Sequence, residues 1–249
     1  MGRQKMMFTS RLRRSARTKY RDILVSILSS YQKEADSGQM VKVLDVGAGS
    51  CWLLNLLPRE CMRVGLDLHA YHQSIDRTTF ADFLDAESAH FVWGDATRLP
   101  FADDTFDIVY SNEFVSHVRS IDQTLLEQIR VLKRGGSILI MDANVLNPVT
   151  FFDCLIVIYL GSRRAETKRG GMKWLLHRDE PFYEPGPMRQ GARLVCWTDE
   201  NIHSQYWWRR KLRSYAGIMD FKVGTFWSYL PISWFGVVAN KILIVGKKL

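Results

Sequence analysis

The chain has 249 residues, of which 47% are hydrophobic and 24% charged, and this composition excludes a disordered protein and allows one large domain. The formal net charge of +8 is unevenly distributed: residues 1–21 carry eight basic and no acidic residues, residues 22–142 carry 10 basic and 18 acidic residues, and residues 143–249 carry 16 and 8. Two basic ends favour an anionic partner, such as a phosphate-bearing substrate or a membrane surface, although a solvated basic surface explains them equally well.

The cysteine pattern and the N-terminal residues indicate the cellular compartment in which the protein is expected. None of the four cysteines forms a Cys-x-x-Cys pair, so we expect neither a metal site nor a disulfide framework, and a reduced cytoplasmic compartment fits best. The basic N-terminus lacks the apolar core and cleavage site of a secretory signal; a mitochondrial transit peptide is the lesser alternative. The longest uncharged run, residues 223–240, contains Pro231 and two glycines, which favours two strands around a loop over a membrane span.

Apolar periodicity predicts alternating helices and strands in the first part of the chain. An amphipathic helix is expected over residues 12–31, and a second helix over residues 122–133, ended by Gly135 and Gly136. Short apolar runs predict strands at residues 41–47, 62–68, 90–94, 106–111 and 137–141. This alternation predicts an α/β fold: a Rossmann-like, doubly wound, mostly parallel sheet with helices on both faces.

The alternation ends after Asp142. A strongly apolar stretch and a turn-rich, basic stretch follow, and no independent core pattern is evident, so we interpret residues 145–197 as an insertion after the fifth strand. A helix is expected from about Thr198 to Gly217, and two strands, at residues 221–229 and 242–245, close the chain.

A glycine-containing turn follows the first predicted strand. Gly47 and Gly49 would let the backbone approach a ligand at the start of the following segment. A dinucleotide fingerprint would need a third glycine where Trp52 stands, which argues against a nicotinamide cofactor. Asp67 ends the second predicted strand, 22 residues after Asp45, at the spacing of a carboxylate that binds ribose hydroxyls.

These features, with three further motifs, resemble the class I S-adenosylmethionine-dependent methyltransferases, in particular their type 11 family. The first motif is Val43-Leu44-Asp45-Val46-Gly47-Ala48-Gly49; it is followed in register by the segments 94–101, 104–111 and 130–136. The resemblance covers about residues 40–142. The chain departs from the family at Cys51, where a third glycine is common, and at Arg134, where proline is usual.

The resemblance implies S-adenosyl-L-methionine as cofactor and assigns roles to residues at strand ends. Gly47 and Gly49 would pass beside its methionine part, Asp45 would orient that loop, and Asp67 would hold the ribose. On the adenine side and near the methionine, the same resemblance assigns Leu68 (packing on adenine), Asp95 and Ala96 (hydrogen bonds to adenine), and Ser111 and Asn112 (methionine moiety). No metal is implied.

Methyl transfer from a sulfonium requires alignment first and a base only if the acceptor must lose a proton. His117 is the best-placed candidate for a catalytic base, although a helix-packing role explains it slightly better; Glu113 is a weaker candidate. His69 and His72 are interpreted as residues of the cofactor loop.

The chain is thus interpreted as one methyltransferase domain acting on a small or lipid- or glycan-linked metabolite, with O-methylation preferred. Its parts are a basic helical arm (1–37), a cofactor-binding core (38–144), the substrate-side insertion (145–197) and a C-terminal helix and strand pair (198–249). The alternatives are C-methylation of a quinone or lipid-like acceptor and a non-catalytic, membrane-associated binding protein. An amphiphilic, anionic substrate and peripheral membrane contact are expected; nucleic acid is not, since no nucleic-acid module is present.

Overall fold

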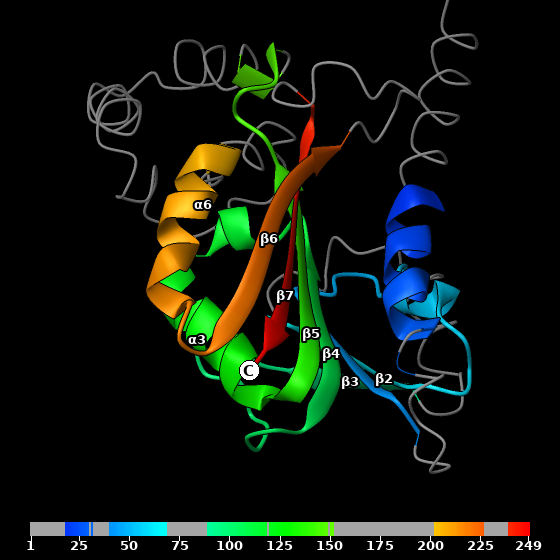
Figure 1. Cartoon of the computed structure of the whole chain (residues 1–249). Helices are drawn as coiled ribbons and strands as arrows, with labels where there is room; N and C mark the ends of the chain where they lie inside the picture. Colours follow the sequence, from blue (N-terminus) through cyan, green and yellow to red (C-terminus); the bar gives the residue numbers. More distant parts are fainter. Residues whose placement is uncertain are drawn as a thin grey trace, which may run out of the picture.

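A computed structural model describes residues 18–29, 31, 40–68, 89–118, 120–148, 150–151, 202–226 and 239–249 (Figure 1). Residues 18–29 form an N-terminal helix. The further elements, in chain order, are β1 (Lys42–Val46), the 3-10 turn η1 (Leu54–Leu56), β2 (Met62–Asp67), β3 (Ala89–Trp93), β4 (Phe106–Asn112), the 3-10 turn η3 (Val115–His117), α3 (Ile121–Val131), β5 (Leu132–Ala143), α6 (Gln205–Leu212), the 3-10 turn η5 (Arg213–Tyr215), β6 (Met219–Phe226) and β7 (Lys241–Lys248).

The strands form one seven-stranded sheet in the order β3-β2-β1-β4-β5-β7-β6. The strands from β3 to β5 pair in parallel, whereas β7 pairs antiparallel with both β5 and β6. This is the predicted mostly parallel, doubly wound sheet, and its strand order reverses between β1 and β4. Open α/β sheets bind ligands outside the carboxyl ends of the strands at such a reversal.

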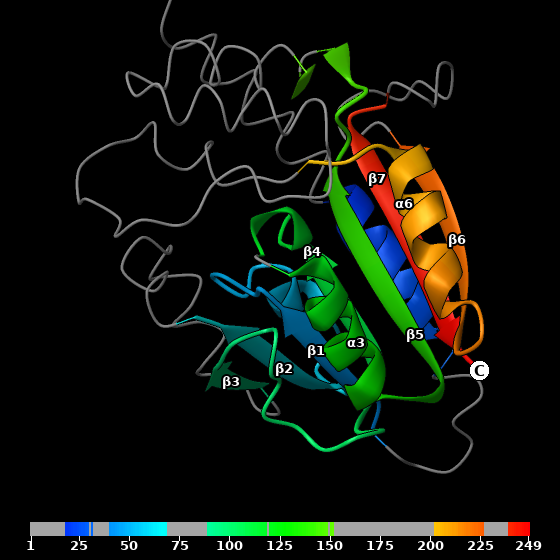
Figure 2. The ribbon, with the colours of Figure 1, turned by 90° about the vertical axis from the view of Figure 1, so that its left-hand side faces the viewer.

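Helices cover both faces of the sheet. Helices α3 and α6 lie on one face, toward the viewer in Figure 2, and the N-terminal helix lies on the other. Each face has its own hydrophobic core: Trp208 of α6 and Leu125 of α3 belong to one, and Leu24 and Leu28 of the N-terminal helix belong to the other. The sheet is therefore buried on both sides, as its nearly continuous apolar strands require.

The boundary between α3 and β5 differs from the prediction. The helix ends at Val131, before the two glycines, and β5 starts at Leu132 without a connecting loop. Gly135 adopts φ +71° inside the strand, and β5 and β4 shift register between Phe106 and Ile108. The glycine pair thus allows an irregular backbone near the start of the long strand β5 and does not end the helix.

The C-terminal helix also begins later than expected. Helix α6 starts at Gln205, because the Ser204 side chain caps it by accepting a hydrogen bond from the Trp207 backbone N–H at 3.2 Å. The proposed start at residues 198–200, most of the insertion and residues 227–238 lie outside the described part of the chain. Within the described ranges, no helix is long and apolar enough to cross a membrane.

Candidate functional site

The glycine turn after β1 is anchored to the neighbouring strand. The backbone N–H groups of Gly47 and Ala48 both donate to the carbonyl oxygen of Leu66, at 2.8 and 3.0 Å. Gly47 and Gly49 have φ angles of +81° and +51°, which glycine adopts without strain. A Cβ atom on Gly47 would lie 2.1 Å from the ring of Phe114, whereas one on Gly49 would meet no atom of the described residues within 4 Å. The described part of the chain therefore leaves space beside the Gly49 backbone that a ligand can enter.

Asp67 joins this turn to the end of β2. Its Oδ2 accepts from the Gly49 backbone N–H and its Oδ1 from the Leu68 backbone N–H, both at 2.7 Å. Each carboxylate oxygen has two lone pairs, so these bonds are compatible with additional ones from ribose hydroxyls. Asp67 thus lies beside the glycine turn.

Asp45 lies under the same turn, fully enclosed at the end of β1. Burial raises its pKa to about 8; the nearby Tyr110 hydroxyl lowers the pKa less than burial raises it, and the charge of Asp67 raises it further. Its Oδ1 has no hydrogen-bond partner among the described residues. A buried carboxyl of this kind favours a nearby cation, because a positive charge stabilises its ionised form.

The adenine-side candidates lie at the end of the adjacent strand β3. Asp95 is exposed, and its Oδ1 accepts from both the backbone N–H and the hydroxyl of Thr97, each at 2.8 Å. No described residue bonds to its Oδ2. Ala96 is buried, and Leu68 is 48% exposed. A carboxylate oxygen and an accessible apolar side chain are thus available near the ends of neighbouring strands.

Two polar side chains at the end of β4 complete this edge. The Ser111 hydroxyl oxygen and the Asn112 Oδ1 are buried without a hydrogen-bond partner among the described residues. Leaving such atoms unpaired is costly, so their place at the ligand-binding edge is consistent with a polar ligand. Together with the open glycine turn and the Asp67 carboxylate, they fit S-adenosylmethionine, whose ribose and amino group are hydrogen-bond donors.

His117 ends the turn η3, which follows β4. Asp142, at the end of β5, is buried; its Oδ2 accepts from the Ser116 backbone N–H at 2.8 Å and its Oδ1 from the Ser116 hydroxyl at 2.9 Å. Burial raises the pKa of Asp142, against the opposing effect of the His117 and Lys241 charges. Asp142 therefore fixes the turn that carries His117 to the carboxyl edge of the sheet.

Glu113 connects three distant parts of the chain at this edge. Lys241 forms an ion pair with its Oε1 at 2.6 Å, and the Tyr20 hydroxyl donates to the same atom at 3.1 Å. Burial alone would raise the pKa of Glu113, but Lys241, Tyr20 and His117 bring it below its ordinary value. Its φ of +53° is strained for a non-glycine residue. Such a carboxylate stays ionised, which makes it a poorer base candidate than His117.

Several residues of the site were not predicted. Phe114 covers Gly47, Asp142 holds the η3 turn, and Tyr20 and Lys241 reach Glu113. The only signal in the sequence was the position of Asp142 directly after an apolar run. Within the described ranges, no group of three His, Cys, Asp or Glu residues could hold a metal ion. His69 and His72 lie outside those ranges.

Solved structures share this architecture. The crystal structure of the YcgJ protein from Bacillus subtilis covers 90% of this chain and 98% of its own, with a TM-score of 0.52 and 18% identity. A CurJ carbon methyltransferase structure covers 91% of this chain and 53% of its own, with a TM-score of 0.57 and 14% identity. The fold is the Rossmann-like fold of the class I methyltransferases.

Sequence similarity gives the family. Residues 44–140 match the family described as "Methyltransferase domain". The chain is 34% identical over 142 residues to a mouse mitochondrial 2-methoxy-6-polyprenyl-1,4-benzoquinol methylase, covering 55% of this chain and 36% of that protein. It is 36% identical over 100 residues to a Coxiella burnetii malonyl-[acyl-carrier protein] O-methyltransferase, covering 39% and 32%. Residues 44–140 thus resemble the methyltransferase domain of type 11 class I S-adenosylmethionine-dependent methyltransferases. The chain's matches span less than half the length of these relatives.

Proposed function

We propose that this protein transfers a methyl group from S-adenosyl-L-methionine to a small-molecule acceptor. The observation that carries the proposal is the glycine turn, which borders open space and is bonded to Asp67 at the carboxyl edge of a class I methyltransferase sheet. S-Adenosylmethionine supplies a methyl group already activated by its positive sulfur. The protein then has to hold the donor, align the acceptor and, where needed, remove a proton.

Each residue at the carboxyl edge of the sheet would bind a different part of the donor. Asp67 would bind the ribose hydroxyls, Asp95 and Ala96 the adenine, and Leu68 would pack on its ring. Ser111 and Asn112, with their unpartnered buried oxygens, would accept hydrogen bonds from the amino group of the methionine part. The buried Asp45 would favour the positive charge of the bound donor from below the turn.

We infer that His117 removes a proton from an acceptor hydroxyl. This inference is supported by its place on a turn that Asp142 holds through Ser116 at the carboxyl edge of the sheet. O-Methylation is the preferred reaction, because a hydroxyl loses its proton as it is methylated.

C-Methylation is the second candidate. The mouse benzoquinol methylase and two Vibrio vulnificus relatives named ubiquinone/menaquinone biosynthesis C-methyltransferase support it. Such acceptors are amphiphilic, in keeping with the proposed amphiphilic substrate and with peripheral contact between a cytoplasmic protein and a membrane surface. Flotation with anionic liposomes at low and high salt tests this contact; no flotation at either salt concentration would refute it.

Calorimetric titration with S-adenosylhomocysteine, with NAD in parallel, tests the proposed cofactor. We expect micromolar binding of the first and none of the second. Asp67→Ala should weaken binding more than about tenfold, because a hydrogen-bonded charged group is worth about 1.5–3 kcal/mol. Asp107→Ala is the control: this carboxylate, on β4 and away from the turn, accepts from the Lys42 backbone N–H and from the Lys133 side chain. Binding of NAD alone would overturn the proposal, and binding of neither would favour a non-catalytic protein.

A panel of hydroxylated and quinol-type acceptors with radiolabelled donor tests the reaction. We expect His117→Gln to lower methyl transfer strongly while leaving S-adenosylhomocysteine affinity within about twofold, because the base acts on the acceptor. Unchanged transfer in this variant would refute the role of His117.

A further inference from the structure

The loop between β3 and β4 carries Asp95 and Ala96 but contains no helix or strand of its own. A segment of this kind has backbone carbonyl groups that need donors from elsewhere. Its internal bonds are short-range: Thr97 donates twice to Asp95 Oδ1, the Arg98 backbone N–H to the Asp95 carbonyl at 3.0 Å, and the Thr105 hydroxyl to the Ala102 carbonyl at 2.7 Å. The shape of this loop is therefore set by the elements that contact it.

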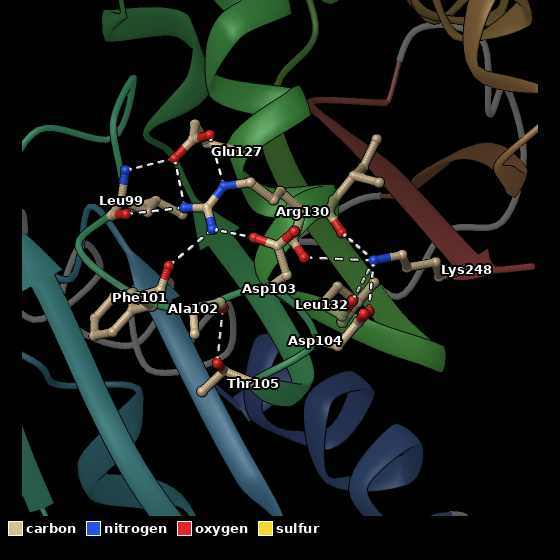
Figure 3. A network of polar contacts seen from close by, with 11 residues as sticks. Leu99, Phe101, Ala102, Asp103, Asp104, Thr105, Glu127, Arg130, Leu132 and Lys248 are labelled. Carbon is tan, nitrogen blue, oxygen red and sulfur yellow. Dashed lines mark hydrogen bonds and ion pairs between the residues drawn. The ribbon is translucent and has the colours of Figure 1, made fainter.

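The Arg130 guanidinium near the end of α3 supplies the missing donors (Figure 3). Its Nη2 donates to the Leu99 carbonyl at 3.0 Å, and its Nη1 donates to the Phe101 carbonyl at 2.8 Å. The Nη1 also donates to Asp103 Oδ1 at 2.7 Å. Three groups spaced along one irregular loop thus converge on a single side chain.

Glu127, one turn earlier on α3, orients this guanidinium and binds the loop itself. Its Oε1 accepts from Nε of Arg130 at 2.9 Å and its Oε2 from Nη2 at 2.8 Å. The same Oε2 accepts from the Leu99 backbone N–H at 2.8 Å. The five N–H groups of arginine match the five bonds formed here, so the side chain is fully satisfied in one geometry.

We propose that Arg130, held by Glu127, is a positioning residue for the cofactor: it fixes the loop that carries Asp95 and Ala96 in the shape that recognises adenine. The inference rests on the proposed function, because the adenine is that of S-adenosylmethionine. Leu99, the first residue that the pair binds, is buried and lies four residues after Asp95. The turn between them is closed by the bond from Arg98 to Asp95. Fixing Leu99 therefore fixes where this turn sits, and Thr97 holds the Asp95 carboxylate within it.

Arg130→Lys tests the proposal, because lysine keeps the charge but cannot bond several groups in the planar geometry of arginine. The measurement is calorimetric binding of S-adenosylhomocysteine and of its hypoxanthine analogue, in which oxygen replaces the adenine amino group. Wild-type protein should prefer the adenine form. We expect Arg130→Lys to bind S-adenosylhomocysteine at least about tenfold more weakly and the analogue nearly as well as wild type does, consistent with the loss of about one charged hydrogen bond.

Two controls separate a positioning role from a stabilising one. Lys133→Met removes an ion pair with Asp107 at 2.7 Å, which lies off the loop, and should leave the preference for adenine unchanged. In the double variant Asp95→Ala/Arg130→Lys, the two effects on the preference should not add, since Arg130 acts through Asp95. If Arg130→Lys does not fold, Glu127→Gln is measured in the same way.

The outcomes are distinct. If wild-type protein does not bind S-adenosylhomocysteine, the proposed function fails. If wild-type protein binds it and a folded Arg130→Lys variant keeps the full preference for adenine, the proposed function stands and the positioning role is overturned.

Discussion

At the scale of single residues, the buried carboxyl of Asp45 makes folding stability depend on pH. Its ordinary pKa is 3.8 and its pKa in the folded chain is about 8, so between these values the folded state holds a proton that the unfolded state has lost. The contribution of Asp45 to the stability of the wild-type protein is therefore highest below about pH 4 and falls as the pH rises toward 8.

We expect Asp45→Asn to remove this dependence, because the amide resembles the protonated acid. Relative to the variant, wild-type protein should lose up to about 1.4 kcal/mol of unfolding free energy per pH unit, the limit for one proton. Urea unfolding of both proteins at pH 5, 6, 7 and 8 measures the difference. If the unfolding free energies of the two proteins changed with pH in the same way, the raised pKa of Asp45 would be contradicted.

Cys51 is a second residue that affects folding stability, because its backbone conformation is strained. It stands where the family often has a third glycine, and the structure gives it a φ of +56° with a fully buried side chain. Its Sγ lies 2.9 Å from the position that a Cβ on Gly65 would take, so the thiol fills the space between the turn and β2. A left-handed backbone costs a non-glycine residue about 1–2 kcal/mol.

We therefore expect Cys51→Gly to be as stable as Cys51→Ala, within about 0.5 kcal/mol, although glycine fills less space; relief of the backbone strain offsets the lost Cβ. Ala48→Gly in the same turn, where φ is not positive, should cost about 1 kcal/mol. Urea unfolding compares the three variants. A Cys51→Gly protein less stable than Cys51→Ala by more than about 1 kcal/mol would show that packing dominates strain.

At the scale of elements, the N-terminal helix is part of the core rather than a detached basic arm. Tyr20, Leu24 and Leu28 recur at helical spacing and are all buried against the sheet. The helix places Tyr20 against the rings of Trp52, after the glycine turn, and Phe226, at the end of β6. It therefore links the glycine turn to the C-terminal strands.

Leu24→Ala should destabilise the protein by about 2–5 kcal/mol, the range for large apolar side chains removed from a core. Asp22→Ala on the exposed face of the same helix is the control, and it should change stability by less than about 0.5 kcal/mol. Chemical unfolding measures both. A loss below about 1 kcal/mol for Leu24→Ala would mean that the helix contributes little to the folded state.

At the scale of the whole molecule, the last strand holds the end of α3 and the start of β4 together. The Lys248 Nζ forms an ion pair with Asp104 at 2.8 Å and donates to the carbonyl oxygens of Ile129 and Leu132 at 2.9 and 2.6 Å (Figure 3). A cation at the end of a helix satisfies carbonyl groups that lack partners within the helix. Residues more than 100 positions apart are thus joined at one point.

Lys248→Met should lower the unfolding free energy by about 1–2 kcal/mol, because two carbonyl groups and Asp104 lose a charged donor. The neighbouring Lys247 is exposed and forms no ion pair with a described residue. Lys247→Met should therefore stay within about 0.5 kcal/mol of wild type. Thermal and urea unfolding measure both variants, and equal effects would show that the contacts of Lys248 contribute nothing specific.

The amino-acid sequence alone determined the strands and the motif positions. Apolar runs located the strands because a parallel sheet buried on both faces needs them. Gly47 and Gly49 were singled out because a tight turn at a strand end favours glycine, and Asp67 because it ends the second strand at the spacing of a ribose-binding acid. The sequence predicted the helix ends less well. Helix α3 ends before its glycines, since β5 continues the chain without a loop. Helix α6 begins directly after a capping serine.

Only the tertiary structure decided which distant side chains meet. Tyr20, Glu113 and Lys241 are far apart in sequence and converge because the start of the N-terminal helix, the end of β4 and the start of β7 lie at the same edge of the sheet. Arg130 likewise reaches a loop some 30 residues earlier through the packing of α3. Local sequence patterns specify elements through short-range geometry, whereas such contacts depend on the order of strands in the sheet, which is set by the burial of all elements together.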